Sequence, residues 1–362
     1  MKLNLKKTKR NLLLIAIVVL PFSCKKDPNP VASNASDGGV YSNGVFITCE
    51  GAFGGSSGTV SFYNRGAKTV SQDINSVNGF PLGNIVQSME IFNKKGYVVV
   101  NNANKIEVVN PGDFLNTGRI SGLVSPRYFL GISSSKAYVS QWGSAGSNEG
   151  VRVIDLTNNT AGALLPAGAG PEKMLKFANY VFVVNCGGFG NDSTITVINT
   201  TNDAVAATIQ VGHNPCSLVL DKNNKMWVLC SGINDFTIPA NSSPGKLLRI
   251  DPLTFDIEAE FTFASAMEHP LNLTINKAKN KLFYLGNMYG GKLYSFDITA
   301  SNLSSTAILN KGFYGLSVDP LTDQIYASTT NFSNGWVFRY APDAALIDSF
   351  EVGVIPGNFC FN

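Results

Sequence analysis

Short apolar runs separated by polar turns make up most of this chain. In one stretch, Cys216–Leu220, Met226–Cys230 and Lys246–Ile250 are runs of about five residues rich in Val, Leu, Ile and Trp. Ile257–Phe263 follows and alternates polar with apolar residues, as a half-exposed strand does. The turns between them contain Asp, Asn, Gly and Pro. The pattern predicts an antiparallel four-stranded unit whose last strand lies on the outside.

A phrase made of a turn residue, often proline, and then an apolar run marks the start of each such unit. The phrase begins at Val86, Pro126, Pro171, Pro215, Pro270, Phe313 and Pro356. The steps between these positions are 40 to 55 residues, and no helical segment interrupts them. A period in the forties built from short strands is typical of a β-propeller with one four-stranded sheet per repeat. The sequence therefore predicts an all-β, seven-bladed β-propeller.

The last phrase, Pro356-Gly-Asn-Phe-Cys-Phe, has no strands after it, and the unit near residue 45 has no such phrase before it. We therefore expect this C-terminal strand to complete the first blade and close the ring. A β-sandwich, or a row of separate β-modules, leaves the final half-repeat without a place. A length of 362 residues would suggest two domains by default, but a continuous repeat favours a single propeller over residues 41–362.

The N-terminal residues have the form of an export signal. Basic residues between Lys2 and Arg10 precede an apolar run, Leu12–Phe22, that is too short to span a bilayer. Ser23-Cys24 resembles a bacterial lipobox, which implies cleavage before Cys24 and lipid attachment to it. Cys24-Lys-Lys-Asp-Pro resembles the start of Bacteroidetes lipoproteins, which implies a lipid anchor in the outer membrane, facing the cell exterior. An ordinary secreted protein, cut a few residues away, is the alternative.

Residues 24–40 contain Pro, Asn, Ser, Asp and Gly with few apolar residues, and we expect a flexible, lipidated tether. The formal charge of +3 comes from the predicted signal peptide, residues 1–23, which holds five basic residues and no acid. Without it, 23 Lys and Arg face 25 Asp and Glu. No basic stripe remains, so the composition does not indicate a nucleic-acid partner.

Cys216 and Cys230 flank the turn of one predicted hairpin, and a regular register places them opposite each other. They could form a cross-strand disulfide in an oxidising compartment, or remain two buried thiols. Cys49 and Cys360 belong to the same predicted blade but are out of register.

The loops that join second to third strands, and the starts of the inner strands, share one face of a propeller around its central channel. In this chain those positions combine amide or acidic side chains with aromatic rings. The predicted ligand-binding residues are Glu50, Phe53, Gln87, Asn101, Arg127, Tyr128, Gln141, Trp142, Asn185, Phe189, Phe236, Asn287, Tyr289, Tyr314, Asn331 and Phe332. Aromatic rings supply contact area and amides fix orientation, so the set suits a large polar organic ligand with flat parts. Asn and Gly also recur in turns for backbone reasons alone.

Catalytic motifs are weak in comparison. The sequence has no Gly-x-Ser-x-Gly elbow, no Cys-x-x-Cys and no phosphate-binding loop. Its two histidines, His213 and His269, precede prolines at the starts of neighbouring blades. A metal site formed by this pair with Glu50 or Glu268 is a minority alternative. We therefore expect a binding protein that requires no cofactor, not an enzyme.

The segment Val45-Phe-Ile-Thr-Cys-Glu-Gly-Ala-Phe-Gly, with Thr59-Val-Ser-Phe-Tyr-Asn after it, resembles the opening of YncE-like seven-bladed propellers of Bacteroidetes lipoproteins. Cys49 and Ala52 stand where that family has asparagine. The repeat start Val211-Gly-His-Asn-Pro-Cys fits the same family. Some members, of the BtuG type, sit over a TonB-dependent transporter and capture cobalamin. The resemblance implies a surface lipoprotein that captures a ligand, with cobalamin as the best candidate, and passes it to such a transporter.

The same resemblance leaves two other classes open. YncE-like propellers are similar in fold to lactonases and antibiotic lyases. This similarity implies, as one alternative, an enzyme with a metal in the central channel of the propeller. A scaffold that binds a protein or a glycan is the other.

Overall fold

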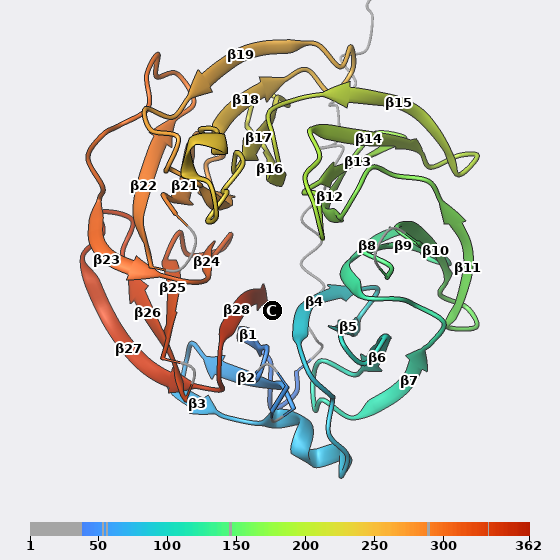
Figure 1. Ribbon diagram of the computed structural model, residues 1–362. Helices are drawn as coiled ribbons and strands as arrows, with labels where there is room; N and C mark the ends of the chain where they lie inside the picture. The colour runs from blue at the N-terminus through green and yellow to red at the C-terminus, as the bar shows by residue number, and fades with distance from the viewer. Residues whose placement is uncertain (1–37, 53, 56, 145–146, 288–289, 332) are drawn as a thin grey trace, which may run out of the picture.

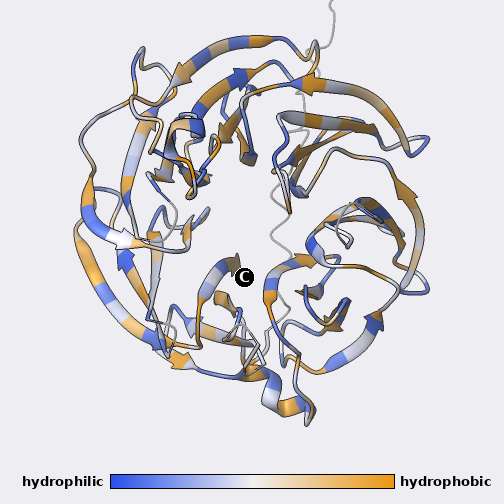
Figure 2. Cartoon of the chain, in the orientation of Figure 1, coloured by the Kyte–Doolittle hydropathy of each residue, from blue (hydrophilic) through white to orange (hydrophobic). Residues whose placement is uncertain are grey.

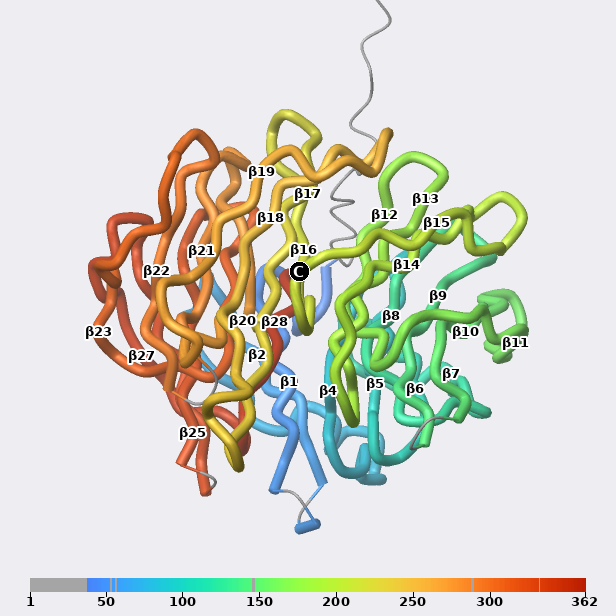
Figure 3. The backbone as a smooth tube through the Cα atoms, turned by 45° about the horizontal axis from the view of Figure 1, so that its top comes forward, coloured from blue at the N-terminus to red at the C-terminus, as the bar shows by residue number. Residues whose placement is uncertain are grey.

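The computed structural model describes residues 38–52, 54–55, 57–144, 147–287, 290–331 and 333–362. Seven four-stranded antiparallel sheets form a ring around a central axis (Figure 1), which confirms the predicted all-β, seven-bladed propeller. Inner strands such as β16, β20 and β28 stand around the axis when the molecule is tilted (Figure 3).

Each blade runs from an inner strand beside the axis to an outer strand at the rim. Blade one contains β28 (Pro356–Phe361), β1 (Gly44–Cys49), β2 (Thr59–Asn64) and β3 (Thr69–Ser71). Blade two contains β4 (Val86–Phe92), β5 (Lys95–Val100), β6 (Lys105–Val109) and β7 (Asn116–Ile120). Blade three contains β8 (Pro126–Ser133), β9 (Lys136–Gln141), β10 (Gly150–Asp155) and β11 (Thr160–Leu165). Blade four contains β12 (Pro171–Phe177), β13 (Tyr180–Asn185), β14 (Thr194–Asn199) and β15 (Ala204–Gln210).

The remaining blades follow the same order. Blade five contains β16 (Pro215–Leu220), β17 (Met226–Cys230), β18 (Lys246–Ile250) and β19 (Ile257–Thr262). Blade six contains β20 (Leu271–Ile275), β21 (Lys281–Leu285), β22 (Gly291–Asp297) and β23 (Leu309–Phe313). Blade seven contains β24 (Leu316–Val318), β25 (Ile325–Thr330), β26 (Gly335–Tyr340) and β27 (Leu346–Val352). Two short 3-10 helices, η1 (Ile74–Asn78) and η2 (Pro239–Asn241), lie in connections.

The core consists of apolar clusters sandwiched between neighbouring blades. Successive side chains of a strand point to opposite faces of its sheet, so each middle strand supplies two clusters. In β17, Met226 and Val228 pack against blade four, while Trp227 and Leu229 pack against blade six. Outer strands such as β19 and β27 alternate hydrophilic and hydrophobic segments instead (Figure 2), because one face of each strand is more exposed to solvent than the other.

Ring closure occurs where the sequence predicts it. β28 pairs antiparallel with β1, with Val45 opposite Phe361 and Ile47 opposite Phe359. Cys360 lies opposite Phe46 and Cys49 opposite Pro356, so these two cysteines are out of register, as expected. Before β1, Tyr41 packs its ring on the edges of blade-one and blade-two aromatics, 5.1 Å from the ring of Phe62.

The expected opposition of Cys216 and Cys230 is wrong. Cys230 pairs with Pro215, and the ladder resumes with Ser217 opposite Leu229, so a β-bulge at Cys216 shifts the register by one residue. Both cysteines are free thiols. Cys230 is buried in the cluster between blades four and five, while Cys216 turns towards the axis. The bulge therefore places the two sulfur atoms on opposite sides of the sheet.

Within the described residues, no helix is both long enough and apolar enough to cross a lipid bilayer.

Candidate functional site

A cavity of about 530 Å³ lies on the propeller axis, at the end where the second-to-third strand loops meet the starts of the inner strands. Every blade contributes at least one residue to its wall, and we refer to it as the funnel. A volume in this range is usual for a small-molecule site.

β-Bulges at the starts of the inner strands build the inner wall of the funnel. Six of the seven inner strands have a bulge within their first residues. A bulge adds an unpaired residue and re-aims its side chain. The bulged residues that line the funnel are Gln87, Arg127, Tyr128, Glu172, Lys173, Cys216, Asn272 and Gly357. The bulges explain how charged residues occupy strands that are otherwise apolar.

A backbone hydrogen bond that recurs in five blades lies at the rim of the funnel. In five blades the residue before the inner strand has a positive φ: Ile85, Ser125, Gly170, Asn214 and Ile355. Its carbonyl accepts a hydrogen bond from the residue after the second strand, which is respectively Asn101, Trp142, Cys186, Ser231 and Glu50, at 2.8–3.0 Å. β-Branched residues such as Ile85 rarely adopt this conformation. Local strain of this kind, held by surrounding structure, is common at functional sites.

An ion pair between blades three and four forms one side of the funnel. Arg127 donates two parallel hydrogen bonds to the Glu172 carboxylate, both at 2.8 Å, and a third to Gln87. The guanidinium lies 4.0 Å from the centre of the Trp142 ring, a cation–π distance. Burial alone would lower the pKa of Arg127, but the Glu172 carboxylate outweighs burial and raises it. The Arg127 guanidinium is therefore charged, and its hydrogen bonds to Glu172 and Gln87 hold it in place.

Glu50 and Tyr314 form the opposite side. The Tyr314 hydroxyl donates to Glu50 Oε1 at 2.9 Å. Burial raises the pKa of the Glu50 carboxyl, and the hydrogen bond from Tyr314 offsets only part of that increase. Gly357 leaves room for this contact, because a Cβ there would lie 2.7 Å from Glu50 Oε1.

Two thiols and a histidine complete the wall near blades four to six. Burial raises the pKa of both Cys186 and Cys216, so neither is a thiolate at neutral pH. His269 is 2 % exposed, and its Nδ1 lies 3.0 Å from the carbonyl oxygen of Ser231. Among the described residues, no group of three His, Cys, Asp or Glu side chains is arranged to hold a metal ion. His213, the other member of the minority metal pair, is exposed and does not line the funnel.

The structure brings together seven of the predicted ligand-binding residues. Those lining the funnel are Glu50, Gln87, Arg127, Tyr128, Trp142, Phe236 and Tyr314. Phe189 lies beside them at the rim, 5.9 Å from the Trp142 ring and 66 % exposed.

Other predicted ligand-binding residues do not line the funnel. Gln141 and Asn185 are fully buried as the last residues of their strands, and Asn185 bonds to Thr194 and Thr196 within its own blade. The amide of Asn101 donates to the Pro126 carbonyl, and Asn287 and Asn331 are exposed loop residues. The predicted positions Cys24, Phe53, Tyr289 and Phe332 lie outside the described residues.

Sequence reasoning missed Glu172 and Lys173, together with the two funnel cysteines. A signal for the first two exists, because Pro171-Glu-Lys places adjacent charges inside a strand that should be buried. The Arg127-Tyr128 pair occupies the same two positions after Pro126.

A family model matches most of the chain, and solved structures of similar fold exist. A family model described as a domain of unknown function, DUF5074, matches residues 43–349. No curated protein sequence matches the chain. Among solved structures, a quinonprotein alcohol dehydrogenase-like protein from Bacteroides thetaiotaomicron has a TM-score of 0.66 at 16% identity, covering 89% of this chain and 78% of that one.

Two further structures, each named a "putative 6-phosphogluconolactonase", are also similar. The one from Bacteroides uniformis has a TM-score of 0.66 at 11% identity and covers 88% of this chain and 100% of its own. The one from Bacteroides fragilis has a TM-score of 0.63 at 10% identity and covers 90% and 100%. At such low identity the likeness shows the fold alone.

Proposed function

The chain belongs to the DUF5074 family, and from its funnel we propose that it is a ligand-binding propeller that captures a large polar organic molecule at the cell surface. The observation that carries this proposal is the composition of the funnel wall. Tyr128, Trp142 and Tyr314 offer flat rings, and Gln87 and Asn272 offer amides, around about 530 Å³ of open space.

A corrinoid such as cobalamin, which is large, amide-rich and partly flat, is the specific ligand we propose. It exceeds the cavity in size, so one part of it would enter the funnel. The rest would lie across the rim near Phe236, which is 80 % exposed. The export signal and Cys24 support a lipid anchor in the outer membrane, and a TonB-dependent transporter is the partner that would receive the ligand.

Calorimetry of the purified protein with cyanocobalamin tests the ligand. Aromatic anchors in pockets carry most of the binding energy, so Trp142→Ala is expected to weaken binding by about 2 kcal/mol. Trp142→Phe keeps a flat ring under Arg127 and is expected to lose less. Glu258→Ala, in the outer strand β19, is the matched control and is expected to bind as the wild type does. Absence of binding at micromolar protein would refute cobalamin as the ligand.

Hydrolysis of a sugar lactone is the second candidate, favoured by the raised pKa of the Glu50 carboxyl inside the cavity. A carboxyl with a raised pKa can donate a proton to a bound substrate or accept one from it. Turnover of 6-phosphogluconolactone by the wild type, lost in Glu50→Gln but retained in Glu258→Gln, would establish an enzyme. No turnover in the wild type would reject this substrate.

A further inference from the structure

Lys173 differs from every other charged residue of the funnel in its surroundings. It occupies the bulge of β12, next to Glu172, and lines the cavity. Its ammonium nitrogen lies 5.9 Å from the centre of the Tyr128 ring of β8, and the Cys216 thiol of β16 lines the same cavity. Three successive blades therefore converge on this one cation.

Among the residues that the structure describes, no carboxylate forms a salt bridge with Lys173, and the charge of Glu172 acts on it only from a distance. The adjacent Glu172 is engaged by Arg127 through both of its carboxylate oxygens. Glu50 accepts its hydrogen bond from Tyr314, on the far side of the funnel. The Cys216 thiol, which lines the same cavity, already donates to the carbonyl of Leu229.

A lysine placed in this way has an incomplete electrostatic environment. Burial lowers the pKa of Lys173, and its neighbours offset only part of that decrease. Three N–H donors remain available to a group that enters the cavity. An anion that arrives with the ligand would supply both the missing charge and the missing acceptors.

We propose that Lys173 forms an anion-binding subsite of the funnel, so that the natural ligand carries a phosphate or a carboxylate next to a flat group. The inference rests on the proposed ligand-binding function and narrows its ligand class. The flat group would lie against Tyr128 and Trp142, because these rings flank the same part of the wall. A phosphodiester-containing corrinoid and a sugar acid both satisfy this description, whereas a neutral glycan does not.

Thermal unfolding with inorganic phosphate as the probe tests the subsite. A ligand that binds only the folded state raises Tm by mass action. At phosphate well above its dissociation constant we expect a rise of about 2 °C over sodium chloride of equal ionic strength. The rise should disappear in Lys173→Met, which keeps the length of the side chain but not its charge. It should persist in Lys173→Arg and in Lys292→Met, a control at an exposed lysine of β22.

Two results would overturn the subsite: a wild type whose Tm responds no more to phosphate or acetate than to chloride, or a Lys173→Met variant that keeps the wild-type response. Acetate at the same ionic strength forms a parallel arm, and the larger shift shows whether phosphate or carboxylate is preferred. Calorimetry with cyanocobalamin tests the cobalamin ligand separately. A phosphate response without cyanocobalamin binding would support the subsite and count against cobalamin as the ligand. Cyanocobalamin binding without a phosphate response would support cobalamin and count against the subsite.

Discussion

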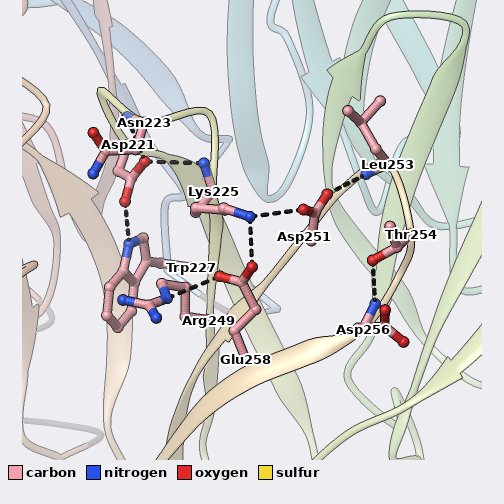
Figure 4. A network of polar contacts seen from close by, with 10 residues as sticks. All are labelled: Asp221, Asn223, Lys225, Trp227, Arg249, Asp251, Leu253, Thr254, Asp256 and Glu258. Carbon is pink, nitrogen blue, oxygen red and sulfur yellow. Dashed lines mark hydrogen bonds and ion pairs between the residues drawn. The ribbon is translucent and has the colours of Figure 1, made fainter.

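Lys173 and Lys225 belong to neighbouring blades and differ in what surrounds their ammonium groups. Lys225 belongs to the turn that leads into β17, at the opposite end of blade five from the funnel. Its ammonium group reaches Asp251, in the turn after β18 (Figure 4). It contacts Asp251 at 2.7 Å and Glu258 at 2.5 Å. These hydrogen bonds raise the pKa of Lys225, whereas burial lowers that of Lys173. The ammonium group of Lys225 has two carboxylate partners, whereas that of Lys173 forms no salt bridge with a described residue.

The network around Lys225 is complete within blade five. Glu258 also accepts from Arg249 at 3.1 Å, and Asp221 accepts from the indole of Trp227 at 2.9 Å (Figure 4). The network ties two turns of the blade together. Because its outer members are solvated, each ion pair contributes little to the free energy of unfolding. The comparison indicates that charges which serve the fold are saturated by partners. The funnel charge that lacks a partner is the one to associate with a ligand.

The largest expected difference is in the loss of unfolding free energy on removing Glu172 from the funnel or Glu258 from the network around Lys225. Glu172→Ala leaves Arg127 buried without its carboxylate, and we expect a loss of about 3 kcal/mol in the free energy of unfolding. Glu258→Ala removes a partly exposed partner, and we expect a loss of at most about 1 kcal/mol. Urea denaturation of both variants measures the two losses. Equal losses would show that the Arg127–Glu172 pair is solvated as fully as the outer network.

The two lysines should respond to the same substitution with opposite signs. Lys173→Met removes a cation that burial disfavours, and we expect the unliganded protein to gain about 1 kcal/mol of stability. Lys225→Met removes a favourable partner of two carboxylates and should lose up to about 1 kcal/mol. Urea denaturation in buffer without phosphate, which would occupy the proposed subsite, measures both. A loss of stability in Lys173→Met would show that the cation already has a partner in the folded protein.

A smaller effect is expected from pH. The folded-state pKa of Lys173 is lowered, so its charge destabilises the fold below that pKa, and the penalty is relieved as pH rises towards the ordinary lysine value near 10.5. The pKa of Lys225 is raised, so its contribution is fully present below 10.5 and is lost as pH rises through the raised pKa. The gain from Lys173→Met should therefore shrink between pH 7 and pH 10, while the loss from Lys225→Met should stay constant. Denaturation midpoints at the two pH values test this, and a gain that does not change with pH would contradict it.

The repeat predicts the blades closely because each strand has its own apolar pattern. The bounds of Met226–Cys230 and Lys246–Ile250 are the same in the sequence prediction and in the structure. The period in the forties and the half-repeat at the C-terminus were sufficient for the seven blades and the closure of the ring.

The funnel was predicted less well because bulges and strand ends break the simple alternation. Gln141 and Asn185 are the last residues of their strands and still point into the blades, while Trp142 and Cys186, one position later, reach the funnel. Residue type alone does not distinguish such neighbours. Lys173 was missed because a regular strand would turn only one of two adjacent residues towards the axis, whereas its bulge turns both.

The pairing of β1 with β28 also has a consequence for how the protein is made. The first strand of the propeller to be synthesised, β1, belongs to a sheet whose inner strand, β28, is the last strand of the propeller to be synthesised. Until then β1 has an open edge, and the clusters on both sides of blade one lack the side chains of Phe359 and Cys360. Contacts between such distant parts of a chain form slowly and favour aggregation of the unfinished protein. We therefore expect the ring to fold only after β28 has been synthesised.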